Sequence, residues 1–464
     1  MSKNKEKITP KVLTREEKKQ FNRELLTLAV PLALRNLLQA LVGASDALML
    51  GRLNQASISA VSLANQVSFV MSLFSGAVIG AVGVLIAQYF GKGDTKNAKR
   101  FLAMALRYTT GIALVFFLLA FLVPENVMRI FTPDEELIRI GAGYLRIVSF
   151  SYLFSGIAQC YLMMMQISGR VRMSLWISGI TVIVDMTADL FLIYGIGKWE
   201  GLGANGSAYS TIAVEVIAMA ICIVESRQKD HIHPDAESLR FFSKAFERDI
   251  WYVIRGMLAG SLCWGLSITM HAFILGHLGS DATAANSVTG VAQQLIQGMT
   301  HGLASGGGII LGKLLGQDKL AEAKAYGKRF FRVSFFSGLV NVGLLLIVGP
   351  LVYFFYKLDP QAKQYLIWML LYLLLYMFAY AYNTIFTCGV FPAGGDSRYD
   401  AISVFIATWC VAIPLALLGC FVFHWPVMLI YIVMCADEIV KVPFIRLRFN
   451  TDIWLKNLTR EDAG

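Results

Sequence analysis

Three aspartates interrupt stretches of sequence that are otherwise almost wholly apolar. Asp46 lies in the apolar run 43–51, and Asp185 and Asp189 lie four residues apart in a second run. Residues i and i+4 share one face of a helix, so Asp185 and Asp189 would present their carboxylates together. An ionised carboxylate is costly in hydrocarbon and normally faces a cavity and a partner. These residues therefore indicate a site for a hard cation or a proton.

The depth of these residues in the expected helices links them to one another. Asp46 and Asp189 each lie about four residues before the outer end of a helix, and Thr211 lies about one and a half turns inside the end of a third. We therefore predict that Asp46, Asp185, Asp189 and Thr211 form the cation-coupling site. No metal is expected beyond Na⁺ at the three aspartates. The alternative is that one aspartate merely caps a helix or packs against a serine.

Aromatic, methionine and amide side chains in the apolar runs could line a cavity for flat organic cations. The candidates for this substrate cavity are Phe154, Tyr161, Met164, Gln297, His301, Tyr376, Tyr380 and Asn383. Ordinary helix packing is the alternative for each of them.

Further charged side chains have simpler interpretations. We expect Arg35 to extend toward the membrane interface rather than to act in gating. Asp437, Glu438 and Lys441 have i/i+3 and i/i+4 spacing, which predicts a structural ion pair. The seven cysteines lie in apolar stretches without any CxxC pair, so neither disulfides nor a zinc site is expected.

Twelve apolar segments are available to position these residues. The chain is 56% hydrophobic and 16% charged, with a mean hydropathy of +0.59, which is typical of membrane proteins. A helix needs about 20 apolar residues to cross a bilayer. The expected spans are 25–50, 60–86, 101–123, 138–165, 173–195, 205–226, 251–276, 285–314, 328–355, 364–389, 399–423 and 426–446. The sequence therefore predicts an all-α integral membrane protein with twelve transmembrane helices.

Basic residues alternate between the loops and predict the orientation of the chain. The net charge of +10 is gathered in short clusters between the apolar runs, which argues against a nucleic-acid partner. The positive-inside rule places both termini in the cytoplasm. The membrane that holds the protein is expected to be the cell inner (plasma) membrane. The expected parts are a cytoplasmic N-terminal tail (1–24), an N-lobe (25–226), a cytoplasmic linker (227–250), a C-lobe (251–446) and a cytoplasmic C-terminal tail (447–464).

The two halves repeat each other at a nearly constant offset. Gly83 corresponds to Gly308, and Gly91 to Gly316. A six-helix unit has an even number of spans, so the repeats are parallel and predict two pseudo-symmetric six-helix lobes. This symmetry suits alternating access. By the same offset His271 takes the position of Asp46, so we expect coupling in the first half.

Several motifs in order resemble the multidrug and toxic compound extrusion (MATE) family. Pro31 and the Asp46 stretch resemble the family's first helix, and the Gly-x-x-Arg loops in 166–172 and 392–398 resemble its paired loops. Segment 437–441 resembles the family's end. The aspartates resemble the DinF-like arrangement of the cation site, although relatives commonly carry Asn where this chain has Asp185.

The resemblance implies a secondary antiporter rather than an enzyme. It would export small organic, often cationic compounds in exchange for H⁺ or Na⁺ by alternating access. Its expected partners are small-molecule substrates, H⁺ or Na⁺ and the lipid bilayer, with no nucleic acid, no cofactor and a monomeric state. A lipid-linked oligosaccharide flippase of the same superfamily is the alternative, followed by a membrane-embedded enzyme. A passive channel is only weakly excluded.

Overall fold

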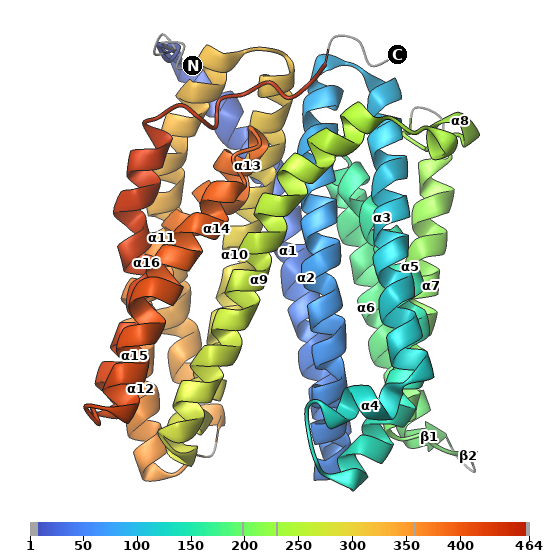
Figure 1. Cartoon of the computed structure of the whole chain (residues 1–464), viewed down its shortest axis with the longest axis vertical. Helices are drawn as coiled ribbons and strands as arrows, with labels where there is room; N and C mark the ends of the chain where they lie inside the picture. Colours follow the sequence, from blue (N-terminus) through green and yellow to red (C-terminus); the bar gives the residue numbers. More distant parts are fainter. Residues whose placement is uncertain (1–7, 197–198, 229–230, 357, 461–464) are drawn as a thin grey trace. The chain divides into compact units, whose positions relative to one another are not determined.

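The computed structural model describes residues 8–196, 199–228, 231–356 and 358–460. Within these ranges the chain is almost entirely helical, with one short hairpin (Figure 1). The described elements include twelve long helical rods, which confirms the predicted fold class. Residues 1–7 and 461–464, at the ends of the predicted tails, lie outside the described residues.

The first half of the chain supplies six long helices and the hairpin. Their bounds are α1 (Arg15–Leu53), α2 (Gln55–Lys92), α3 (Thr95–Leu122), the short α4 (Pro124–Arg129), α5 (Glu135–Ile167), α6 (Val171–Tyr194), β1 (Gly195–Ile196), β2 (Trp199–Glu200) and α7 (Ala204–Ser226).

The second half begins after the short α8 (Ala236–Arg240) and contains two rods that are interrupted by π-helical turns. Its elements are α9 (Lys244–His277), α10 (Ser280–Gly316), α11 (Leu320–Phe355), α12 (Pro360–Thr384) continuing through η1 (Ile385–Val390) into α13 (Phe391–Ala393), α14 (Arg398–Val404) continuing through η2 (Phe405–Ala412) into α15 (Ile413–Phe421), and α16 (Val427–Phe449).

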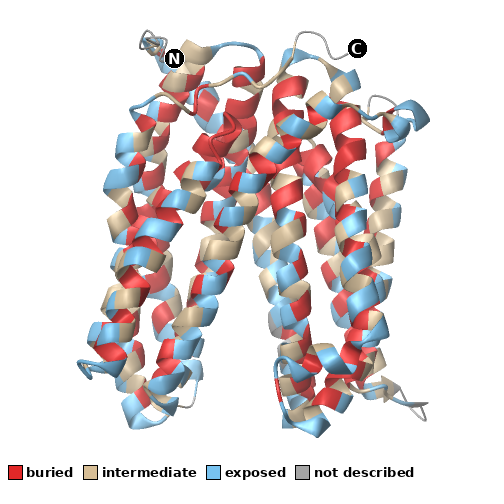
Figure 2. Cartoon of the chain, in the orientation of Figure 1, coloured by how far each residue is buried: buried red, intermediate tan, exposed pale blue. Residues whose placement is uncertain are grey.

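Ten of the described helices are long and apolar enough to cross a membrane. The other two long rods are α10, which is rich in glycine and small polar residues, and α16, which carries Asp437, Glu438 and Lys441. Large apolar side chains such as Trp176 and Phe354 are exposed on the rods, as expected where a helix faces lipid. Figure 2 shows buried positions interleaved with exposed ones along the helices.

Local sequence explains several helix ends. The side chain of Asp94 accepts a hydrogen bond of 3.0 Å from the backbone N–H of Asn97 and caps α3. Asp134 caps α5 by accepting from Glu136 N–H at 2.9 Å. Helix α6 ends at Gly195, whose φ of 83° lies in the left-handed region that glycine tolerates. The end of α6 is therefore fixed five residues after Asp189.

The contacts divide the chain into two compact units. The N-terminal unit comprises Leu34–Ile86 and Asp94–Phe246, and the C-terminal unit comprises the described parts of Met1–Ala33, Ala87–Gly93 and Glu247–Gly464. The predicted boundaries of the two lobes stay a prediction.

In the N-terminal unit, α5 packs against α3 and α7, and α6 packs against α7. Small residues allow this close approach, as in many membrane helices. A side chain at Gly156 of α5 would contact Thr109 of α3, and one at Gly206 of α7 would overlap the carbonyl of Leu192 on α6. The position of α7 against α6 therefore depends on glycine.

In the C-terminal unit, α12 packs against α10, α11 and α16, and an aromatic core contains Phe330, Phe386 and Phe449. Lys441 Nζ lies 2.7 Å from Glu438 Oε1 and 3.5 Å from Asp437 Oδ2, which confirms the predicted ion pair. Asn383 Nδ2 donates to Glu438 Oε2 at 2.6 Å. Asn383, a candidate for the substrate cavity, therefore belongs to this buried ionic network.

Candidate cation site and the cavity beside it

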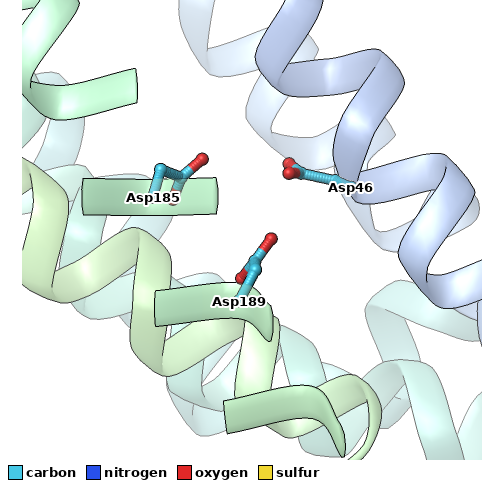
Figure 3. A group of neighbouring side chains, drawn as sticks. All are labelled: Asp46, Asp185 and Asp189. Carbon is cyan, nitrogen blue, oxygen red and sulfur yellow. The ribbon is translucent and has the colours of Figure 1, made fainter. Parts of the chain in front are cut away.

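Three carboxylates converge inside the N-terminal unit. Asp46 on α1 points toward Asp185 and Asp189 on α6 (Figure 3). One oxygen from each residue lies within 4.8 Å of the other two. Asp185 and Asp189 are buried, and Asp46 is half-buried. The structure thus brings together the three aspartates that the sequence singled out, while their role in coupling stays a prediction.

The helices hold these side chains in place through contacts close to the site. The i/i+4 spacing puts Asp185 and Asp189 on one face of α6. Tyr194, at the end of α6, donates a hydrogen bond of 2.6 Å to the carbonyl of Met49 on α1. Met49 is three residues after Asp46, so this bond fixes α1 against α6 within one turn of the carboxylates.

Helix α7 contributes a hydroxyl to the site. Ser210 Oγ lies 3.1 Å from Asp185 Oδ1 and 3.2 Å from the carbonyl of Asp185, so its single proton can serve either acceptor. The predicted ligand Thr211 instead donates to the carbonyl of Ser207 in its own helix, at 2.9 Å. The lone pairs of the Thr211 oxygen are still available, so its place in the site stays a prediction. The contact between Ser210 and Asp185 is the kind that the alternative describes, an aspartate that packs against a serine.

With all three carboxylates ionised, the site would carry more negative charge than the described residues around it neutralise. Asp46 Oδ1 and Asp189 Oδ1 are buried without a hydrogen-bond partner among the described residues. None of the ion pairs seen between described residues involves the three aspartates. Two unit charges at 4.8 Å repel each other by about 3 kcal/mol at an effective dielectric constant of about 20. A bound proton or monovalent cation would relieve this repulsion and satisfy the unpaired oxygens.

Next to the carboxylates lies a cavity of about 170 Å³, lined entirely by the N-terminal unit. Its polar lining consists of Arg35, Gln39, Gln159, Ser178, Thr181, Asp185 and Glu215. Asp185 therefore belongs both to the carboxylate group and to the wall of the cavity. The rest of the lining is apolar and comes from α1, α5, α6 and α7.

Two charged residues of this cavity differ from what the sequence suggested. Arg35 was expected to extend to the membrane interface, but it lines the cavity and buries its Nε without a hydrogen-bond partner. Glu215 was missed altogether. The available signal was a glutamate inside the apolar segment 205–226, where a charged side chain is costly.

The predicted substrate-cavity residues are divided between the two units, and none of them lines this cavity. Tyr161 is buried and stacks on the ring of His233, with centroids 6.0 Å apart. Tyr380 and the ring of His301 share a hydrogen bond of 2.9 Å. The role of the eight residues in a substrate cavity stays a prediction.

His271, the counterpart of Asp46 in the repeat, lies on α9 in the C-terminal unit. Its Nε2 is buried without a hydrogen-bond partner. Among the described residues, the group of three convergent carboxylates is found only in the N-terminal unit. The two halves therefore differ in chemistry at corresponding positions.

Known proteins resemble this chain in sequence and in fold. The profile of the MatE family matches residues 31–190 and 257–418. "Probable multidrug resistance protein YoeA" of Bacillus subtilis is 22% identical over 417 residues, covering 88% of this chain and 89% of its own. "Probable multidrug resistance protein NorM" of Thermotoga maritima is 24% identical over 460 residues, covering 97% of each chain.

Solved structures agree with this fold. A MOP superfamily transporter from Pyrococcus furiosus superposes with a TM-score of 0.82 at 16% identity, covering 93% of this chain and 96% of its own. A MATE transporter in an outward-facing conformation gives a TM-score of 0.81 at 16% identity, covering 93% of this chain and 95% of its own. At such low identity these likenesses establish the fold alone.

Proposed function

Because this chain belongs to the MATE family of multidrug efflux transporters, we propose that it is a cation-coupled antiporter whose coupling site is formed by Asp46, Asp185 and Asp189. It is a multi-pass membrane transporter and not an enzyme. The single observation that supports the coupling site most strongly is the convergence of three carboxylates that have no ion-pair partner among the described residues.

The coupling ion and the exported compound compete for the negative charge of the three aspartates. With three negative charges, the site favours a bound H⁺ or Na⁺ while it is closed to water. An organic compound entering next to Asp185 competes for the same negative charge, so binding of the compound favours release of the ion. Alternating exposure of the site to the two sides of the membrane then couples export to the ion gradient.

The proposed setting is the plasma membrane, with both termini in the cytoplasm and the transporter acting as a monomer. The named relatives from Bacillus subtilis and Thermotoga maritima are described as multidrug resistance proteins. We take their substrate class, small organic compounds, as the proposal for this chain. A lipid-linked oligosaccharide flippase has no comparable support, because the charges described above suit a small cation better than a long polar chain.

Drug-resistance assays in an efflux-deficient host test the coupling site. Asp46→Asn or Asp189→Asn should abolish resistance at normal expression, because each change removes a charge that attracts the coupling ion. His271→Asn, at the corresponding position in the second half, is the matched control and should retain most of the resistance. Loss of resistance with His271→Asn alone would place the coupling in the other half.

A further inference from the structure

The cavity beside the carboxylates has opposite charges in its wall. Arg35 of α1 and Glu215 of α7 both line it, and they are close enough for their charges to interact. The described contacts include no hydrogen bond or ion pair between their side chains. The guanidinium and the carboxylate therefore share one small cavity without pairing directly.

Each of the two charges lacks a described partner for its head group. The Nε of Arg35 is buried and has no hydrogen-bond partner in the described part of the chain, so this N–H requires an acceptor. Guanidinium groups bind carboxylates through two parallel hydrogen bonds, with a geometry that Lys cannot reproduce. Glu215 has no hydrogen bond among the described contacts, and a carboxylate in such a site binds an ammonium group well.

The size and apolar wall of the cavity limit the ligand further. Drug-sized ligands occupy pockets of roughly 300–1,000 Å³, whereas this cavity measures about 170 Å³. The lining also includes apolar side chains, among them Leu162, Ile177 and Val182. A ligand that satisfies all three features is small, has one acidic and one basic group, and has a compact apolar body.

We propose that this cavity binds a compact zwitterion of amino-acid size, with its carboxylate on Arg35 and its ammonium on Glu215. The ligand is either the whole transported compound or the zwitterionic end of a larger one. This assignment adds an acidic group to the often cationic substrates that the sequence suggested. Arg35 and Glu215 then determine substrate specificity and are distinct from the three coupling aspartates.

The cavity also explains how such a ligand would be linked to the coupling ion. Asp185 lines the cavity and belongs to the carboxylate group, so both ligands alter the charge around one residue. Linkage of this kind is reciprocal: if the coupling ion weakens zwitterion binding, the zwitterion weakens ion binding equally. Only this linkage rests on the proposed antiport, and zwitterion binding itself does not.

Equilibrium binding to the purified protein in detergent, without any ion gradient, tests the proposal. The probes are L-leucine, leucinamide, which lacks the carboxylate, and N-acetylleucine, which lacks the ammonium. L-leucine should bind about tenfold or more tightly than either derivative, since each loses one charge-assisted contact. Equal binding of all three probes to the wild-type protein would overturn the proposal.

Variants assign each charge separately. Arg35→Gln should bind leucine and leucinamide alike, with partial recovery of the preference in Arg35→Lys. Glu215→Gln should bind leucine and N-acetylleucine alike. Arg146→Gln, on α5 outside this cavity, is the matched control and should leave all three affinities unchanged. An Arg35→Gln protein that loses affinity for all three probes equally would show a structural role and contradict the assignment.

The binding experiment and the transport experiment test the two proposals independently. If Asp46→Asn abolishes transport while the ranking of the three probes persists, the zwitterion site stands and the coupling account stands with it. If the probe ranking is absent from the wild-type protein while Asp46→Asn abolishes transport, the zwitterion proposal is wrong and the coupling account survives.

Discussion

At the scale of single residues, the chemistry depends on charge that the surroundings leave uncompensated. Asp46, Asp185 and Asp189 place oxygens within 4.8 Å of one another, and two of these carboxylates have a buried oxygen without a partner. Asp185 differs from the other two because it also lines the adjacent cavity. Its replacement should therefore weaken coupling without removing it.

Asp185→Asn should raise the concentration of coupling ion required for half-maximal efflux by about tenfold or more. The reason is that one of three charges, each interacting with a bound cation by several kcal/mol, has been removed. Efflux at saturating ion concentration should persist. The measurement is efflux from loaded cells over a range of pH and Na⁺ concentration, with Glu136→Gln on α5 as the control.

Two results of that experiment would contradict the account. An ion dependence identical to that of the wild type would place Asp185 outside the coupling group. Complete loss of efflux at every ion concentration would show that Asp185 is as indispensable as Asp46, and its separate role would have to be abandoned.

At the scale of elements, the close approach of α6 and α7 positions the site. Gly206 has no room for a side chain against the carbonyl of Leu192. Gly206→Ala should push α7 away from α6, move Ser210 away from Asp185 and destabilise the protein by about 1–3 kcal/mol. Thermal unfolding of the purified protein and drug resistance in cells should both show the loss.

Gly179→Ala on α6 provides the comparison, because a Cβ there meets no atom within 4 Å. This variant should unfold at the wild-type temperature or slightly above it, since alanine favours a helix over glycine. Equal behaviour of the two variants would show that the contact between α6 and α7 does not determine the site.

The long helices and the meeting of the three aspartates could be predicted from the sequence. The contacts of individual side chains could not. Hydropathy was sufficient for ten of the long rods, and i/i+4 spacing for the shared face of Asp185 and Asp189. Which of Ser210 and Thr211 donates to Asp185 and which to its own helix depends on the rotation of α7. Glu215 forms no spacing pattern with Arg35, because the two lie on helices far apart in the sequence.

At the scale of the whole molecule, the charge of the loops predicts the orientation of the chain in the membrane. Asn54 lies between α1 and α2, and Asp281 lies in the first turn of α10. In a variant without the native cysteines, a cysteine at either position should react with a membrane-impermeant maleimide in intact cells. A cysteine at Arg240, in the predicted cytoplasmic linker, should react only after the cells are opened. The reverse pattern would overturn the orientation.

Transport driven by an imposed ion gradient in proteoliposomes tests the central claim most directly. Substrate movement should follow an imposed H⁺ or Na⁺ gradient, reverse when the gradient is reversed and stop when an ionophore collapses it. Asp46→Asn proteoliposomes should show none of this gradient-driven movement. Substrate movement that ignores both gradients in the wild-type protein, or that persists unchanged in Asp46→Asn, would contradict cation-coupled export through the three aspartates.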